Sequence, residues 1–138
     1  MKVSYECGMM NAEHYHFLRT QIGWSSYTTE EIEAGLKNSL FIITAYFNKN
    51  PIGMGRVIGD GKMVFYIQDI IVLEAYRGKG IGKTIMQHVM NYIENNSVNN
   101  SIVGLMAATG KEMFYEKFGF IKRPNDRMGC GMNIWVKK

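Results

Sequence analysis

Apolar positions recur along the chain with two spacings, and these separate predicted helices from predicted strands. An isoleucine or valine recurs every fourth residue from Ile81 to Ile93, so residues 81–96 are predicted to form an amphipathic helix with one buried face. Residues 63–73 are instead an almost unbroken apolar run, as expected for a strand at the centre of a sheet that is covered on both faces.

Capping and turn signals place the remaining elements. Asn11 is predicted to cap a helix that runs to Gln21 with Phe17 and Leu18 inward, and Thr-Thr-Glu-Glu at 28–31 is a capping box that opens a second helix. A short helix over residues 111–118 is predicted to stop at Gly119, and strands are predicted over residues 3–7, 40–47, 52–59, 63–73, 102–107, 120–121 and 132–136, with turns at 48–51 and 60–61. This order of elements predicts an α+β fold, in which a mostly antiparallel meander of strands is followed by one crossover helix.

Composition narrows the class of protein. The 138 residues fit one domain spanning residues 1–138, and the net charge of +4 is mildly basic. Because the basic residues are dispersed, we expect a small polyanionic ligand and no nucleic-acid partner. Cys7 and Cys130 show no metal-ligand spacing, so no metal is expected. No signal peptide is visible and no apolar run could span a bilayer, so a cytoplasmic protein without a membrane partner is expected.

The strongest chemical signal is the glycine-rich segment at residues 77–82, Arg-Gly-Lys-Gly-Ile-Gly, between the long strand and the long helix. Its glycines leave backbone N–H groups bare beside the positive end of a helix dipole, which favours an anion. A Walker A loop counted from Gly78 is one residue short, and a dinucleotide fingerprint fails because Lys83 stands where its third glycine belongs. The pattern Arg/Gln-x-x-Gly-x-Gly/Ala is matched in full by Arg77, Gly80 and Gly82.

With the motifs at residues 66–72 and 76–82, and Tyr-Glu-Lys-x-Gly-Phe at 115–120, the chain resembles the GNAT superfamily of acetyl-CoA-dependent N-acetyltransferases. The resemblance covers the element order from the first strand to the last, and its most specific motifs lie between Asp69 and Phe120. It implies a GNAT fold with a mixed, largely antiparallel, twisted sheet of six to seven strands flanked by four helices. The sequence of residues 129–135 is similar to that found in one branch of the superfamily, whose members resemble arylalkylamine acetyltransferases.

The resemblance implies acetyl-CoA as the co-substrate. Its pantetheine arm would run along the backbone of the long strand, its pyrophosphate would bind the N–H groups of the glycine loop, and an N–H near Val72 would polarise the thioester carbonyl. The implied acetyl-CoA-binding residues are Ile70, Ile71, Val72, Arg77, Gly78, Lys79, Gly80, Ile81, Gly82 and Lys83. Many relatives also hold the pantetheine with an asparagine at the position of Ala108, so here Thr109 and Lys111 replace that contact or it is missing.

Two side chains are candidates for proton transfer. The resemblance implies that Tyr115 protonates the departing CoA thiolate, and the alternative is a core aromatic that packs with Phe114 and Phe118. Asp69 interrupts an apolar run, where a carboxylate must be paired or hydrogen-bonded. It is a candidate base for the attacking amine or else a structural anchor. Gln68 cannot act as a base, although many relatives carry a glutamate near this position.

The acceptor is less defined than the donor. Trp24, Tyr27 and Tyr66 are predicted to line an apolar pocket for a primary amine on a small molecule. The alternatives are acetylation of a protein lysine or N-terminus, which needs an open groove, and a non-catalytic acyl-CoA sensor on the same fold. A homodimer is compatible with the resemblance, because many relatives form one.

Overall fold

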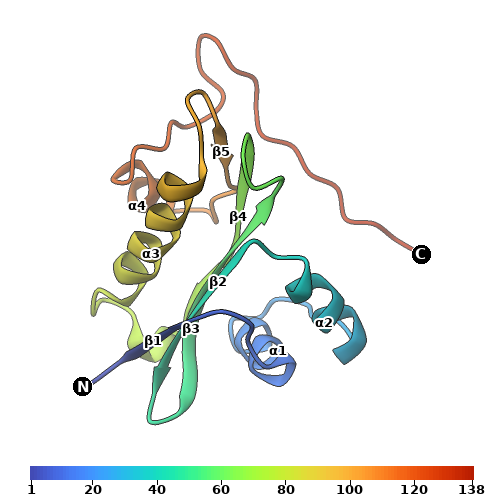
Figure 1. Ribbon diagram of the computed structural model, residues 1–138, viewed down its shortest axis with the longest axis vertical. Helices are drawn as coiled ribbons and strands as arrows, with labels where there is room; N and C mark the ends of the chain where they lie inside the picture. Colours follow the sequence, from blue (N-terminus) through green and yellow to red (C-terminus); the bar gives the residue numbers. More distant parts are fainter. The chain divides into compact units, whose positions relative to one another are not determined.

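The computed structural model describes residues 1–138, whose contacts divide the chain into two compact units, Met1–Gly104 and Leu105–Lys138. The first unit holds a five-stranded sheet in the order β1-β2-β3-β4-β5 (Figure 1). The first four strands pair antiparallel and β5 pairs parallel to β4. The strands span Ser4–Cys7 (β1), Phe41–Phe47 (β2), Asn50–Gly59 (β3), Val64–Val72 (β4) and Ile102–Gly104 (β5).

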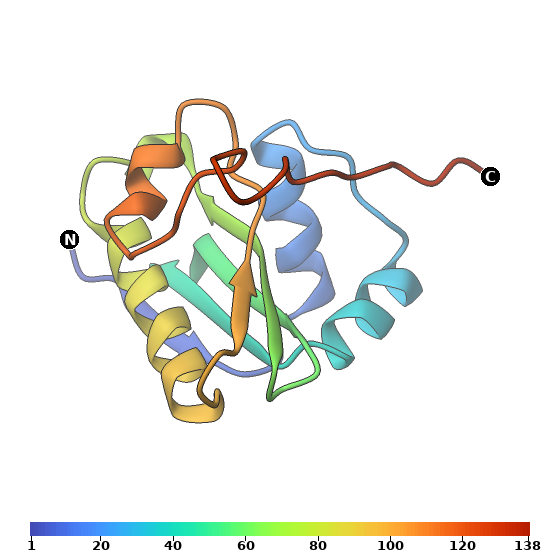
Figure 2. The same ribbon diagram turned by 90° about the horizontal axis from the view of Figure 1, so that it is seen from above.

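Helices cover both faces of this sheet, with α1 (Ala12–Gln21) and α2 (Thr29–Lys37) on one face and α3 (Ile81–Asn96) on the other (Figure 2). A single turn of 3₁₀ helix, η1 (Glu74–Tyr76), leads from β4 to the loop before α3. On the α1–α2 face the buried cluster includes Leu18 together with Met54 and Ile71 of the sheet. The α+β class predicted from the sequence is therefore confirmed.

The two predicted helix caps form as expected. The side chain of Asn11 accepts hydrogen bonds from the backbone N–H groups of Glu13 and His14, and so caps α1. At α2 the Thr28 hydroxyl accepts from the Glu31 N–H, while the Glu31 carboxylate accepts from the Thr28 N–H. These contacts lie within four residues of each other, which is why local sequence was enough to predict them.

The burial of the helices follows the predicted periodicity with one exception. Ile81, Ile85, Val89 and Ile93 of α3 are all at most 3% exposed, so the four-residue repeat is confirmed. In α1, Leu18 is buried, but Phe17 is 40% exposed and the prediction that it faces inward was wrong. The inward face of α1 carries Tyr15, Leu18 and Arg19 instead, at the spacing of one helical face.

The second unit contains one short helix, α4 (Glu112–Glu116), and no strand. The expected strands at 120–121 and 132–136 are absent, and the strand expected over 102–107 stops at Gly104. The sheet therefore has five strands rather than six to seven. Met132 and Ile134 are both 86% exposed, so their apolar pattern has no neighbouring strand or core to face. A β-favouring sequence becomes a strand only where such a partner exists.

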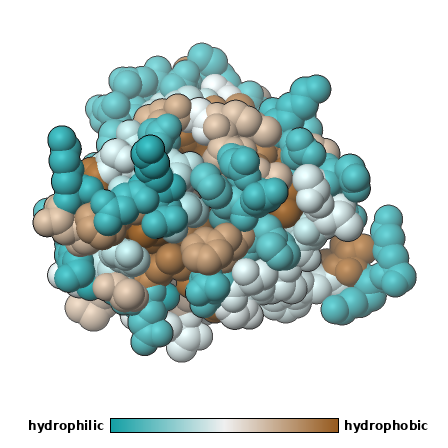
Figure 3. Space-filling view, turned by 90° about the horizontal axis from the view of Figure 1, so that it is seen from below, coloured by the Kyte–Doolittle hydropathy of each residue, from teal (hydrophilic) through white to brown (hydrophobic).

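Hydrophobic and hydrophilic side chains are mixed on the surface. On the face shown in Figure 3, hydrophilic side chains separate small groups of hydrophobic ones, as is usual for a globular protein. None of the helices is both long enough and apolar enough to cross a membrane.

Candidate active site

A β-bulge in β4 lies at the centre of the first unit. Met54 pairs with Ile71 and Arg56 pairs with Gln68, so β4 has one residue more than β3 over this stretch. Asp69 lies within it with φ +58°, a left-handed conformation that aspartate tolerates better than most residues. Because the extra residue interrupts the alternation of side chains, the bulge sets which face of the sheet each following residue occupies.

Asp69 is held by three donors that come from two other elements. The Tyr15 hydroxyl donates to its Oδ2 over 2.6 Å, Arg19 Nη1 donates to its Oδ1 over 2.8 Å, and Arg56 Nε donates to its Oδ2 over 3.1 Å. The Asp69 side chain has no exposed surface. Burial, reinforced by the charge of Asp69, raises the pKa of Tyr15 to about 12, so its phenol stays protonated and donates at neutral pH.

This environment favours the anchoring role of Asp69 over the role of base. A general base must reach the proton it abstracts directly or through one water. Both carboxylate oxygens of Asp69 are already occupied by charged or phenolic donors, and the side chain does not reach solvent. We therefore interpret Asp69 as the residue that fixes the bulge to α1 and β3.

Beyond the bulge, one edge of β4 has no strand beside it. β5 pairs with β4 only at Val64, Phe65 and Tyr66, so residues 67–72 have no strand on that edge. Leu73 donates its N–H to the Ile52 carbonyl on β3. Because successive N–H groups alternate in direction along a strand, the N–H of Val72 points to the open edge. The predicted site for the pantetheine arm is thus an available strand edge.

The glycine loop presents bare backbone donors at the start of α3. Gly78 and Gly80 have φ of +76° and +82°, and an added Cβ would meet nothing within 4 Å at either position. Glycine is needed there for backbone conformation rather than for space. The first helical hydrogen bond runs from the Thr84 N–H to the Gly80 carbonyl, and no side chain caps the helix. The N–H groups of residues 81–83 are therefore free for an anion.

Three basic side chains lie in or beside this loop, one hydrogen-bonded to the backbone and two without an ion pair. Arg77 turns back, and its Nε donates to the Val72 carbonyl over 2.9 Å. That contact links the end of the open β4 edge to the loop. Lys79 and Lys83 are exposed and form no ion pair, since both ion pairs of the structure are made by Asp69. Their charges are available to a phosphate-bearing ligand, though screened by solvent.

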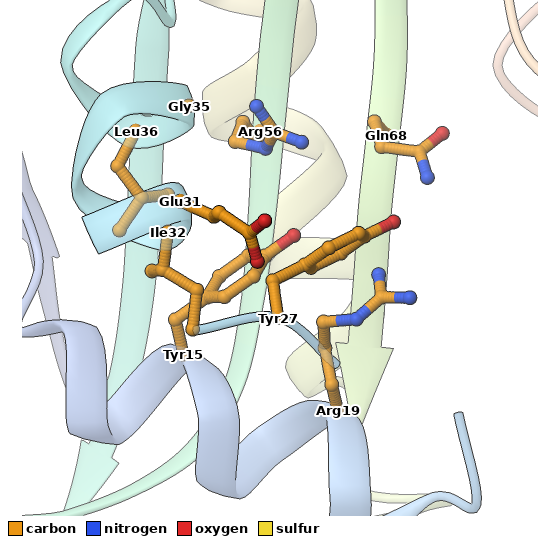
Figure 4. A pocket seen from close by; sticks show the side chains of 9 residues that line it. All are labelled: Tyr15, Arg19, Tyr27, Glu31, Ile32, Gly35, Leu36, Arg56 and Gln68. Carbon is orange, nitrogen blue, oxygen red and sulfur yellow. The ribbon is translucent and has the colours of Figure 1, made fainter. Parts of the chain in front are cut away.

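A pocket of about 240 Å³ opens on the α1–α2 face of the sheet, beside the bulge (Figure 4). Its side chains converge from α1, the loop before α2, α2 itself, β3 and β4. It is lined by Tyr15, Arg19, Tyr27, Glu31, Ile32, Gly35, Leu36, Arg56 and Gln68. Gln68 lies two positions before Ile70, about 7 Å along the strand, so the pocket adjoins the open β4 edge.

The three residues predicted to line an acceptor pocket fall in different places. Tyr27 lines the pocket, and its ring centroid lies 5.3 Å from Cζ of Arg19. Trp24 does not line it but lies equally close to the same guanidinium group, at 5.3 Å. Tyr66 is on β4 opposite Gly104 of β5 and is not among the lining residues. Partial burial, followed by the charge of Asp69, raises the pKa of Tyr66.

Tyr115 belongs to the second unit, on α4. Its ring packs edge-on against Phe114, with centroids 5.0 Å apart, and against Phe120 at 6.3 Å. Phe114 also packs with Phe118 at 5.5 Å, so the predicted apolar pair is present beside the tyrosine. Burial raises the pKa of Tyr115, which keeps its phenol protonated at neutral pH. A protonated phenol is the form that a general acid requires.

Sequence reasoning missed Arg19 and Arg56. Each is a charged residue within an apolar context: Arg19 follows Leu18 on the buried face of α1, and Arg56 lies inside the apolar strand β3. Asp69 has the same character in β4. Because an isolated buried charge is costly, three such charges of mixed sign could have been predicted to pair. The spacing of these residues along the sequence did not show which of them form ion pairs.

Comparison with known proteins gives a consistent result. The model of the acetyltransferase (GNAT) domain family matches residues 11–134. A crystal structure from meticillin-resistant Staphylococcus aureus, described as a protein of unknown function and probable acetyltransferase, is 43% identical with a TM-score of 0.89. That alignment covers 98% of this chain and 100% of that one.

Two further relatives are more distant. An uncharacterized N-acetyltransferase, ycf52, of Pyropia yezoensis is 27% identical over 78% of this chain, which spans 63% of the length of that relative. The structure of Arabidopsis thaliana Naa50 in complex with the bisubstrate analogue CoA-Ac-MVNAL is 27% identical, with a TM-score of 0.72. It is matched over 90% of this chain and 86% of its own.

Proposed function

Because the chain belongs to the acetyltransferase (GNAT) domain family, we propose that it transfers an acetyl group from acetyl-CoA to a primary amine of a small molecule. The amine attacks the thioester carbonyl directly: the new C–N bond forms, the C–S bond breaks, and the CoA thiolate leaves. The amine loses one proton and the thiolate gains one. The observation that carries this proposal is the open β4 edge, followed within a few residues by the bare N–H groups of the glycine loop.

The residues divide this work as follows. The pantetheine amides would extend the sheet along residues 70–72, and the pyrophosphate would bind the N–H groups at the start of α3. The Val72 N–H, at the open edge, would stabilise charge on the carbonyl oxygen in an oxyanion-type role. Tyr115 would protonate the thiolate. Asp69 acts as a positioning residue, because it fixes the bulge that shapes this edge.

The size of the pocket supports a small acceptor. Its volume of about 240 Å³ is below the roughly 300–1,000 Å³ of pockets that hold drug-sized ligands. The second candidate acceptor is the amine of a peptide or protein. It is supported by the similarity to Naa50, whose structure is in complex with the bisubstrate analogue CoA-Ac-MVNAL. The third alternative is a non-catalytic acyl-CoA sensor.

One assay separates these three functions. Release of CoA thiol is measured with acetyl-CoA and a panel of small primary amines, lysine-containing peptides and peptides with free N-termini. Release with small amines supports the proposal, and release with peptides alone supports the second candidate acceptor. Binding of acetyl-CoA without release with any acceptor would identify a sensor.

The glycine loop gives a second test. Replacing Gly80 by alanine is expected to move the loop out of its left-handed conformation, which costs an L residue about 1–2 kcal/mol. Binding of acetyl-CoA would then have to restore that conformation, so KM for acetyl-CoA should rise about tenfold. Gly129→Ala is the matched control: its φ is not positive and an added Cβ meets nothing within 4 Å. Equal KM values for the two variants, measured by CoA-thiol release at varied acetyl-CoA, would remove the loop from the binding site.

A further inference from the structure

The pocket beside the bulge contains more positive charge than its buried carboxylate can neutralise. Arg19 and Arg56 both pair with Asp69, so one buried anion is shared between two guanidinium groups. Their side chains are 10% and 15% exposed. Because these side chains have little contact with water, a charge without a counterion is costly there. A site with an excess of positive charge therefore favours an anionic ligand.

Each guanidinium group also keeps one nitrogen free of the protein. Arg19 donates from Nε to the Ser25 carbonyl and from Nη1 to Asp69, while Arg56 donates from Nε to Asp69 and from Nη1 to the Ser39 hydroxyl. Neither Nη2 has a protein acceptor. Because no fully buried side-chain nitrogen or oxygen lacks a partner, neither Nη2 atom is fully buried. Both residues line the pocket (Figure 4).

The aromatic surroundings hold Arg19 in place. Its Cζ lies 5.3 Å from the ring centroids of Trp24 and Tyr27 and 5.8 Å from that of Tyr15. With Nε and Nη1 also engaged, the guanidinium plane has little freedom left to lose when a ligand binds. Planar guanidinium groups fixed in this way suit carboxylate and phosphate oxygens better than a flexible lysine would.

Glu31 is the other charged group of the pocket. Its carboxylate accepts the backbone N–H of Thr28, and this hydrogen bond lowers the pKa of Glu31, which therefore stays ionised. The residue is exposed, so water screens its charge. Glu31 also forms no ion pair with Arg19 or Arg56, since both ion pairs of the structure involve Asp69.

We propose that the acceptor carries an anionic group, a carboxylate or a phosphate, which the free Nη2 atoms of Arg19 and Arg56 bind in this pocket. The inference rests on the proposed acetyl transfer and names its acceptor class: an amine with an acidic group at its other end. The apolar walls, Ile32, Leu36 and the two tyrosines, would contact the body between them. The amine would then reach toward the open β4 edge, past Gln68.

The test compares matched pairs of amines in the CoA-thiol release assay. 6-Aminohexanoate, with its amine and carboxylate at opposite ends of an apolar chain, is compared with pentylamine, which lacks only the carboxylate. Phosphoethanolamine is compared with ethanolamine, which lacks only the phosphate. We expect kcat/KM for at least one anionic member to exceed that of its neutral partner by about tenfold or more. The pair that shows the preference identifies the anionic group. Neutral members that react as well as both anionic ones would overturn the inference while leaving acetyl transfer intact.

Gln68→Glu tests the site of binding without removing either arginine. The substitution keeps the shape of the side chain and adds a negative charge to the pocket lining. The ratio of anionic to neutral kcat/KM is expected to fall about tenfold. Gln87→Glu makes the same change on the exposed surface of α3, outside the pocket, and should leave the ratio unchanged. If the arginines served only to anchor Asp69, neither variant would alter it.

A binding measurement keeps the inference separate from catalysis. Calorimetric titration of 6-aminohexanoate and phosphoethanolamine into the CoA-loaded protein should show binding that is stronger than for the neutral partners and weaker in Gln68→Glu. That result supports the anionic class even if no acceptor in the panel is acetylated, in which case the proposed function alone fails. If neither anionic compound binds better than its neutral partner, the inference is overturned.

Discussion

Replacing Asp69 by asparagine is expected to lower the free energy of unfolding by about 3–5 kcal/mol, the usual cost of removing one partner of a buried ion pair. Asparagine keeps the size of the side chain and also tolerates a positive φ, so the bulge can keep its backbone conformation. The loss would therefore arise from Arg19 and Arg56, which remain buried without a carboxylate between them. Urea unfolding followed by circular dichroism measures it.

A matched control removes a carboxylate that makes no ion pair. Glu94 is exposed on α3, and both ion pairs of the structure involve Asp69, so Glu94→Gln should change stability by less than about 0.5 kcal/mol. A loss for Asp69→Asn no larger than this would contradict the anchoring role. Unchanged stability with abolished turnover would instead point to the role of base.

Replacing Tyr115 by phenylalanine is expected to lower kcat about 100-fold, because a positioned general acid contributes roughly 10²–10⁴-fold. KM for acetyl-CoA should stay near the wild-type value, since only a hydroxyl is removed and the ring contacts with Phe114 and Phe120 remain. Steady-state CoA-thiol release at varied acetyl-CoA separates the two parameters. Unchanged turnover would leave Tyr115 as a core aromatic.

The raised pKa of Tyr115 also predicts the direction in which kcat changes with pH. Burial raises the pKa of Tyr115 above its ordinary value of 10.0, so the phenol is protonated and active as an acid throughout the neutral range. In the wild type, kcat should fall only as the pH rises through this raised pKa. Tyr115→Phe should lack that alkaline decrease. Tyr92→Phe, which removes a hydroxyl from α3, serves as the control and should keep both the rate and the decrease.

The comparison of sequence with structure separates local from distant determinants of the fold. The caps at Asn11 and Thr28 and the buried stripe of α3 formed as predicted, because each depends on residues within a few positions or one helical period. The strand predicted at 132–136 did not form. Its residues are mostly apolar and β-favouring, but a strand needs a neighbouring strand, and a short apolar segment does not specify one.

The sequence by itself determined the family and the position of the glycine loop between strand and helix, since glycines and their spacing act through local backbone geometry. Only the tertiary structure showed which side chains contact Asp69. Its partners Tyr15, Arg19 and Arg56 lie 54, 50 and 13 residues away along the chain. Their convergence depends on how α1 packs against the β3–β4 bulge. The surplus positive charge in the pocket, and with it the proposed acidic acceptor, follows from that packing.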